Sequence, residues 1–296
     1  METIGFIGTG HMGGAMAMRL LEAGHPLVVL DRSPAATAPL AARGARVAAS
    51  PREVADGAPV VFACLPSIEA SLAMVDGPDG VAHGGAIEVY VEASTIGEEA
   101  AQAIEARMAA AGVGFVDAPV SGGPRGAREG TLSVIAAGPP PLLERLAPIF
   151  GRLSQRTFRV GERPGQAQVC KLVNNAISIA AMAITCEAVV LGVKAGCDAR
   201  VMIDAINAST GRTSASVDKF PKAILPRTFD YGGPLSIGSK DLELYLEMAA
   251  RHGVTVDVAR AVAALWAQVV AANGPERDYS TMIQPIEQRA GVIVGG

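Results

Sequence analysis

The stretch IGFIGTGHMGGAMAMRLLEAG, residues 4–24, decides how the first half of this chain folds. An apolar run opens it, Gly8, Gly10 and Gly13 follow in the spacing G-x-G-x-x-G, and a helix-like pattern closes it. The chain has 34 glycines among 296 residues, so the spacing alone is weak evidence. The order of strand, glycine-rich turn and helix is stronger evidence, because it directs the free N–H groups of the helix N-terminus into the turn.

Each glycine of this turn has a predicted role in binding a dinucleotide. Gly8 permits the tight turn, Gly10 lets the backbone approach a pyrophosphate, and Gly13 lets the helix pack closely on the strand. The intervening His11 and Met12 start the predicted helix, whose N–H groups and dipole favour an anion. We therefore predict a cofactor site at this turn.

Asp31 ends the next apolar run, LVVLD, about 20 residues after the glycines, as in dinucleotide-binding folds. A carboxylate at this place accepts hydrogen bonds from ribose hydroxyls and repels a 2′-phosphate, which favours NAD over NADP. Arg32 follows it directly, and its guanidinium could pair with such a phosphate or be solvated. We predict NAD as the cofactor and leave NADP open.

The first half of the chain repeats the pattern of strand and helix. Nearly continuous apolar runs alternate with helix-like stretches, which is typical of a parallel sheet covered on both faces. The expected strands are residues 3–7, 27–30, 60–63, 87–91, 114–116 and 132–137.

Helices dominate after about residue 161. They are expected at residues 166–196, 199–208, 242–251 and 257–273. We predict an α/β fold with a doubly wound, Rossmann-type parallel sheet over residues 1–162. An all-helical domain is expected over residues 163–296, with a frayed tail from Ala290.

Composition and charge exclude several classes of protein. Half of the residues are hydrophobic and 18% are charged, as in an ordered globular protein. The net charge of −4 argues against a nucleic-acid surface. The four cysteines and four histidines are scattered, so we expect no metal site and a reducing environment. No basic leader precedes an apolar segment at the N-terminus, so we expect a cytoplasmic protein.

One segment, Leu172–Val193, carries a single charge over a span long enough to cross a bilayer. The polar residues Asn174, Asn175, Ser178 and Thr185 interrupt it. We expect a buried helix of a globular protein rather than contact with a membrane. The rest of the fold, a second subunit or both must then cover it.

Three loops follow predicted strands, at the sheet edge where ligands of open parallel sheets bind. Ser121–Gly123, in FVDAPVSGGP, offer a hydroxyl and backbone N–H groups that could hold a small carboxylate or form an ordinary turn. Leu65-Pro66 and Thr95 follow two other strands. Thr95 with Glu98 also fits a capping box.

The segment GQAQVCKLVNNAIS, residues 165–178, places a lysine among apolar neighbours. Lys171, Asn174 and Asn175 recur at i, i+3 and i+4, so they share one face of the predicted helix. Desolvation and a nearby cationic nicotinamide both disfavour a charged ammonium, as an acid/base lysine requires. A solvated lysine is the alternative. Lys240 and Asp241 lie at the start of another predicted helix. They could have a functional role, or they could simply be charged residues in the first turn of that helix.

Taken in order, these stretches resemble the β-hydroxyacid dehydrogenases, the family of 3-hydroxyisobutyrate dehydrogenase and tartronate semialdehyde reductase. The resemblance covers nearly the whole chain. Its pieces are GFIGTGHMGGAMAMRLLEAGH, LP, ST, DAPVSGG with GTL, GQAQVCKLVNN and KDLEL.

The resemblance implies a role for each matching residue. Lys171 matches the catalytic lysine, and Asn175 matches the amide that helps to orient the substrate, with Asn174 beside it. Ser121, Gly122 and Gly123 match the substrate loop, Thr95 and Lys240 match positions near the nicotinamide, and Leu65 and Pro66 match the LP piece on the cofactor side. The helical domain is then expected to complete the active site and to form the interface of a homodimer or homotetramer.

The implied activity is hydride transfer between a nicotinamide cofactor and a small 3-hydroxy acid, without a metal. 3-Hydroxyisobutyrate, glycerate or tartronate semialdehyde, threonate and β-hydroxy amino acids all remain open as substrates. Imine reductases look similar but typically lack the lysine at position 171. A non-catalytic dinucleotide-binding sensor or scaffold is the other alternative. Arg125 and Arg212 depart from the family pattern, and either could bind a substrate carboxylate or be solvated.

Overall fold

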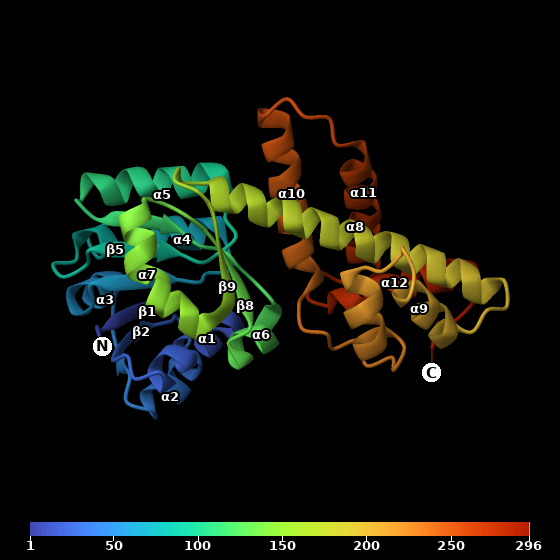
Figure 1. The fold of residues 1–296 in the computed structure, drawn as a ribbon, viewed down its shortest axis with the longest axis horizontal. Helices are drawn as coiled ribbons and strands as arrows, with labels where there is room; N and C mark the ends of the chain where they lie inside the picture. Colours follow the sequence, from blue (N-terminus) through green and yellow to red (C-terminus); the bar gives the residue numbers. More distant parts are fainter. Residues whose placement is uncertain (296) are drawn as a thin grey trace. The chain divides into compact units, whose positions relative to one another are not determined.

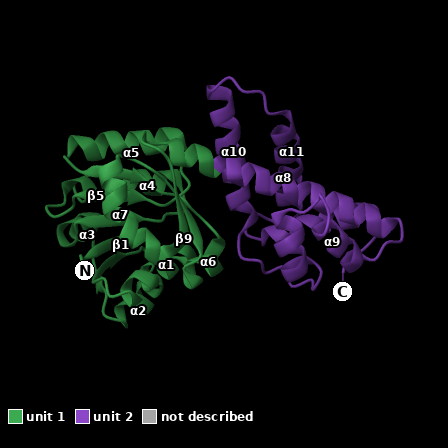
Figure 2. Ribbon diagram, viewed as in Figure 1, with its two compact units in different colours: residues 1–171 green, residues 172–296 purple. Residues whose placement is uncertain are grey.

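The computed structural model describes residues 1–295 and separates into two compact units, residues 1–171 and residues 172–296 (Figures 1 and 2). Helix α8 (Gln166–Lys194) begins in the first unit and continues through the second.

A single sheet forms the centre of unit 1. Its strands are β1 (Ile4–Ile7), β2 (Leu27–Leu30), β3 (Arg46–Val47), β4 (Val60–Ala63), β5 (Val89–Glu92), β6 (Gly114–Asp117), β7 (Val120–Ser121), β8 (Leu132–Ala137) and β9 (Ser154–Gly161). They lie in the order β3-β2-β1-β4-β5-β6-β8-β7, with β9 paired to β8. The first six strands pair in parallel, whereas β8 is antiparallel to both β6 and β7. The order 3-2-1-4-5-6 is that of a dinucleotide-binding sheet.

Helices cover both faces of this sheet (Figure 1). One face packs against α1 (His11–Glu22), α2 (Pro34–Ala41), α6 (Gly123–Glu129) and α7 (Pro140–Leu153), and the other against α3 (Pro51–Gly57), α4 (Ile68–Val75) and α5 (Glu98–Ala110). Successive residues of a strand point to opposite faces. Phe62 of β4 therefore stacks on Phe6 at 5.8 Å between ring centroids in one core, while Val61 lies in the other.

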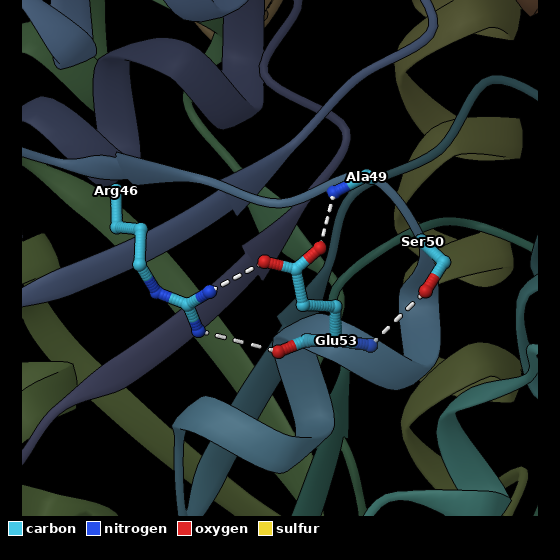
Figure 3. Close-up of polar contacts among 4 residues, drawn as sticks. All are labelled: Arg46, Ala49, Ser50 and Glu53. Carbon is cyan, nitrogen blue, oxygen red and sulfur yellow. Dashed lines mark hydrogen bonds and ion pairs between the residues drawn. The ribbon is translucent and has the colours of Figure 1, made fainter.

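Short elements that hydrophobic periodicity did not indicate are fixed by local hydrogen bonds. Helix α3 is the clearest case (Figure 3). The Oγ of Ser50 accepts from the backbone N–H of Glu53 at 3.2 Å, and Oε2 of Glu53 accepts from the N–H of Ala49 at 2.8 Å. Arg46 Nη1 donates to Oε1 of the same carboxylate at 2.6 Å. The bond to Ser50 satisfies an N–H group at the start of the helix, which lacks a partner within it, and the bonds to the Glu53 carboxylate hold the chain that precedes the helix.

Unit 2 is helical. It contains most of α8, followed by α9 (Ala199–Asn207), the π-helical segment η2 (Ala215–Ile224), α10 (Leu235–Arg251), α11 (Asp257–Asn273), the short helix η3 (Tyr279–Met282) and α12 (Ile283–Ala290). Helix α10 begins seven residues earlier than predicted, because Leu235 is buried and its carbonyl accepts from Trp266 Nε1 at 3.0 Å. An α/β unit followed by a helical unit confirms the predicted fold class.

Helix α8 supplies much of the core of unit 2. Met182, Cys186 and Val189 have no exposed surface and pack with Trp266. By length and composition α8 could cross a membrane, and it is the one such helix among residues 1–295, with 33% of its most apolar window buried. Its opposite face carries exposed apolar side chains, which include Ile177 and Ile184.

The tail is ordered by contacts rather than frayed, so that prediction was wrong for residues 290–295. Val294 is fully buried, and its N–H donates to Glu287 Oε1 at 2.7 Å. Arg227 Nη1 donates both to Glu287 Oε1 at 2.7 Å and to the carbonyl of Val294 at 2.9 Å. Gly296 lies outside the described residues.

Candidate active site

The glycine-rich turn between β1 and α1 has the predicted form. Gly8 has φ +84°, and a Cβ there would lie 2.3 Å from the carbonyl oxygen of Cys64. A Cβ at Gly13 would lie 1.9 Å from the carbonyl oxygen of Gly8. These two glycines are thus required by the turn and by helix packing. At Gly10, in contrast, a Cβ would meet no atom of the described chain within 4 Å. That open space is where the backbone can approach a ligand.

Asp31 lies at the carboxyl end of β2 and is tied to the same turn. Its Oδ2 accepts from the backbone N–H of Thr9 at 2.7 Å, and its Oδ1 accepts from the N–H of Ser33 at 2.8 Å. The carboxylate is half-buried, while Arg32 is exposed. Each carboxylate oxygen can accept a further hydrogen bond. The open space at Gly10 and this anchored carboxylate therefore fit a dinucleotide with a ribose at β2.

Residues after β4 and β5 are joined at the same edge of the sheet. The backbone N–H of Leu65 donates to Ser94 Oγ at 2.7 Å, and the N–H of Ser94 donates to Glu92 Oε1 at 2.9 Å. Pro66 is exposed and Thr95 is half-buried. The loops that carry the predicted cofactor residues are therefore connected by hydrogen bonds within unit 1.

Two side chains, Asp117 and Gln168, fix the start of α8, and no local sequence pattern indicates that they contact each other. Asp117, at the end of β6, accepts from the backbone N–H groups of Gly165 and Gln168 at 3.2 and 3.1 Å and from Gln168 Nε2 at 2.7 Å. The side-chain carbonyl of Gln168 accepts in turn from the N–H groups of Ile96 and Gly97 at 2.9 and 3.2 Å. A carboxylate at a helix N-terminus is favourable. The first turn of α8 is thereby held against the sheet, one turn before Lys171.

The same contacts revise the interpretation of Thr95 and Glu98 as a capping box. Helix α5 begins at Glu98, and its N-cap is Gly97, with φ +81°. The N-cap of α5 is therefore Gly97 and not Thr95. Gln168, from another element, takes over the role of satisfying N–H groups ahead of this helix.

Buried carboxyl groups at this edge have perturbed acidity. Burial raises the pKa of Glu92 to about 7, and the nearby Asp117 adds to this effect. Burial also raises the pKa of Asp117 to about 6, against hydrogen bonds from Gln168 and Gly165 that lower it. Both groups thus titrate close to neutrality, although neither was a candidate from the sequence.

The Ser121–Gly123 loop connects β7 to α6. Ser121 ends the strand, and the next two residues, Gly122 and Gly123, have φ +130° and +66°. A Cβ at Gly123 would meet no atom of residues 1–295 within 4 Å, so its backbone is open to a ligand. Arg125, two residues on, is exposed and pairs with Glu129 at 2.7 Å.

Lys171 lies in the second turn of α8 and is 8% exposed. A solvated lysine, the alternative that the sequence left open, would be far more exposed. Asn174 and Asn175 follow at i+3 and i+4 on the same helix, and therefore on the same face.

Within unit 2, the structure joins two segments that the sequence singled out separately. Asn175 Nδ2 donates to Asp241 Oδ2 at 2.6 Å, and Asn174 Nδ2 donates to Asn175 Oδ1 at 3.1 Å. Lys240 Nζ lies 3.0 Å from Asp241 Oδ1. Asp241 is 4% exposed and was not a predicted site residue. It fixes the orientation of the Asn175 amide and holds Lys240 beside it.

Comparisons with known proteins agree with this geometry. Residues 3–161 match the family model for the NAD binding domain of 6-phosphogluconate dehydrogenase. Residues 165–286 match the model described as NAD-binding of NADP-dependent 3-hydroxyisobutyrate dehydrogenase. A 2-(hydroxymethyl)glutarate dehydrogenase of Eubacterium barkeri is 32% identical over 294 residues, which cover 99% of this chain and 97% of the relative. The chain belongs to the β-hydroxyacid dehydrogenase family.

Other β-hydroxyacid dehydrogenases extend the comparison. An NAD-dependent L-serine dehydrogenase of Pseudomonas aeruginosa is 34% identical over 289 residues, which cover 95% of this chain and 97% of the relative. A Mycobacterium tuberculosis 3-hydroxyisobutyrate dehydrogenase, solved with L-serine, has a TM-score of 0.87 at 30% identity, covering 97% of this chain and 99% of that one. The present chain is accordingly an NAD(P)-dependent oxidoreductase of small hydroxy acids. This confirms the predicted family, cofactor class and reaction.

Proposed function

We propose that this β-hydroxyacid dehydrogenase oxidises a small 3-hydroxy acid, with Lys171 as the general acid and base. One observation supports the proposal above all. The buried Lys171 shares a face of α8 with the amides of Asn174 and Asn175, and Asp241 holds the Asn175 amide. Burial disfavours the ammonium form of a lysine, and an amine in the neutral form is what proton abstraction requires.

In this mechanism the chain binds, orients and moves one proton. Backbone N–H groups of Ser121–Gly123 bind the substrate carboxylate. Lys171 Nζ takes the proton of the substrate hydroxyl while the hydroxyl carbon loses a hydride, and Asn175 orients the hydroxyl. In reverse, the Lys171 ammonium returns the proton to the developing alkoxide. A bound nicotinamide supplies the hydride acceptor or donor.

For the cofactor, NAD is the preferred form and NADP is accepted less well. The Asp31 carboxylate supports this preference, because a 2′-phosphate next to it would be repelled. Residues 8–13, with Asp31, would hold the phosphates and the ribose. Leu65 and Pro66 would contact the cofactor, and Thr95 and Lys240 would lie near its nicotinamide end.

We infer that the working enzyme is a cytoplasmic homodimer or homotetramer, with residues 1–162 binding the cofactor and residues 163–296 completing the site and forming the interface. Ile177, Ile184 and Leu191 recur every seven residues on α8 and are 66, 60 and 70% exposed. Such a stripe is typical of a surface covered by another helix. Ile184→Glu should shift the protein to monomers in analytical ultracentrifugation, and an unchanged mass would count against this interface.

The activity is tested by following absorbance at 340 nm with NAD or NADP and a panel of hydroxy acids. Lys171→Ala should lower turnover by about 10² to 10⁴, the usual contribution of a positioned acid/base group. Cofactor binding should be retained, as measured by NADH fluorescence. Near-normal turnover in this variant would remove Lys171 from the mechanism, and cofactor binding without reduction of any panel member would favour a sensor.

A further inference from the structure

Lys219 is a second buried lysine, which the proposed mechanism does not use. It lies on η2 and is 5% exposed. Its Nζ donates to Ser214 Oγ at 3.0 Å and to Ser178 Oγ at 3.4 Å. The rings of Tyr231 and Tyr279 lie beneath it, with centroids 5.6 and 5.9 Å from Nζ. Hydroxyl groups and aromatic faces thus surround this ammonium.

No carboxylate among residues 1–295 lies within ion-pairing distance of Lys219 Nζ. The adjacent Asp218 is engaged elsewhere, by an ion pair with Lys222 and a hydrogen bond from the hydroxyl of Tyr231. Burying a cation without a paired anion is costly. Burial accordingly lowers the pKa of Lys219, and Asp218 only partly opposes this effect. An anion that reached Nζ would relieve this cost.

The position of Lys219 relates it to the candidate site. Ser178 follows Asn175 by three residues on α8, so the two side chains lie on one face, about 5 Å apart along the helix axis. The hydroxyls of Ser178 and Ser214 are 3.3 Å apart, and Ser214 is exposed. The ammonium therefore lies just inside a solvent-facing pair of hydroxyls, one helical turn from the amide proposed to orient the substrate.

We propose that Lys219, with the hydroxyls of Ser178 and Ser214, binds a second carboxylate of the substrate. The preferred substrate is then a small 3-hydroxy acid with another carboxylate at the end remote from the hydroxyl. This inference rests on the proposed function, because it places the reacting hydroxyl near Asn175. The two hydroxyls donate to the incoming carboxylate, and the ammonium provides a charge-assisted hydrogen bond, which is stronger than a neutral one.

The proposal is tested by comparing kcat/KM for two substrates that share the group to be oxidised. 3-Hydroxyisobutyrate and 2-(hydroxymethyl)glutarate share a hydroxymethyl group and the adjacent carboxylate, and only the second has a remote carboxylate. The wild-type enzyme should have at least a tenfold higher kcat/KM for 2-(hydroxymethyl)glutarate. Lys219→Met should lower that value by roughly ten- to hundredfold, mainly through KM, as expected for loss of a charged hydrogen bond. It should leave 3-hydroxyisobutyrate turnover nearly unchanged.

Two control variants distinguish loss of the Lys219 charge from a general structural defect. Lys219→Arg should retain part of the preference, and Lys194→Met, on an exposed part of α8, should behave as the wild type. An equal loss on both substrates in Lys219→Met, or a wild-type preference for 3-hydroxyisobutyrate, would overturn the proposal.

If neither acid is oxidised, the proposed function fails, and the role of Lys219 is then tested by measuring the affinity for a dicarboxylate. Calorimetric titration of the NADH complex should then show glutarate binding more tightly than butyrate, with the difference lost in Lys219→Met. Equal affinities would overturn the assignment.

Discussion

Asn175 and Asp241 are 66 positions apart in the sequence and are joined by a hydrogen bond of 2.6 Å from Nδ2 to Oδ2. Because the Asp241 carboxylate can only accept, the end of the Asn175 amide that faces it must be the NH₂ group. The carbonyl end then accepts from Asn174. Asp241 therefore positions the Asn175 amide, and in the proposed mechanism it acts on the substrate through that amide.

Asp241→Ala should release this amide and remove the carboxylate that lies beside Lys240. We expect kcat to fall by roughly 10²-fold, as when a positioned group moves by about 1 Å, with a smaller change in KM. Asp241→Asn should recover part of the loss, because its carbonyl oxygen can still accept from Asn175 Nδ2. Steady-state kinetics make the comparison, and thermal melting checks the fold. Equal defects in the two variants would indicate that the charge, and not the orientation, matters.

The local parts of the site could be predicted from the sequence, because each is encoded within a few residues. The turn at Gly8, Gly10 and Gly13 needs only a strand before it and a helix after it. The shared face of Lys171 and Asn175 follows from helical spacing alone. These are short-range relationships, and the structure preserves them.

The contacts across the chain could not be predicted in this way. Asp117 and Gln168 are 51 positions apart, and no periodicity links them. The segment η2, which carries Lys219, has a proline at position 221 and lies between the helices expected at residues 199–208 and 242–251. Strand β9 is not predicted from the sequence because most of its residues are exposed and polar, so it lacks the apolar run of a buried strand. Pairing partners, rather than local pattern, determine such elements.

Two glycines of the turn should respond in opposite ways to substitution. Gly13→Ala places a Cβ against the carbonyl oxygen of Gly8, so the free energy of unfolding should fall by about 1–3 kcal/mol, as for other overpacked sites. Gly10→Val points into open space, so its melting temperature should stay close to wild type while NADH binding is lost. Thermal melting and NADH fluorescence distinguish the two effects. A Gly10→Val protein that binds NADH normally would place the pyrophosphate elsewhere.

The charge of Asp31 should determine cofactor preference. Asp31→Asn keeps a carbonyl oxygen that can accept from Thr9 but removes the repulsion of a 2′-phosphate. The ratio of kcat/KM with NADP to that with NAD should rise by about tenfold or more, which corresponds to a modest Coulomb interaction near a protein surface. Adding Arg32→Ala should reduce the gain if this guanidinium pairs with the phosphate. An unchanged ratio in Asp31→Asn would show that the carboxylate does not face the ribose.

Glu92 should make the stability of the protein depend on pH near neutrality. Burial raises its pKa from 4.5 to about 7, so between these values the folded protein keeps a proton that the unfolded chain has lost. The unfolding free energy must then decrease as pH rises through this window, because the unfolded state binds fewer protons. Glu92→Gln removes this dependence while its side-chain carbonyl can still accept from Ser94.

Relative to wild type, Glu92→Gln should therefore gain stability between pH 5 and pH 8, by up to roughly 3 kcal/mol for a shift of this size. Denaturant unfolding at a series of pH values measures the difference. Glu144→Gln, on an exposed position of α7, serves as the matched control and should follow the wild-type profile. Because Asp117 also titrates nearby, part of the wild-type slope should remain below pH 6 in Glu92→Gln. A variant that parallels the wild type throughout would mean that Glu92 is ionised in the folded protein, with its charge stabilised by the surrounding N–H groups.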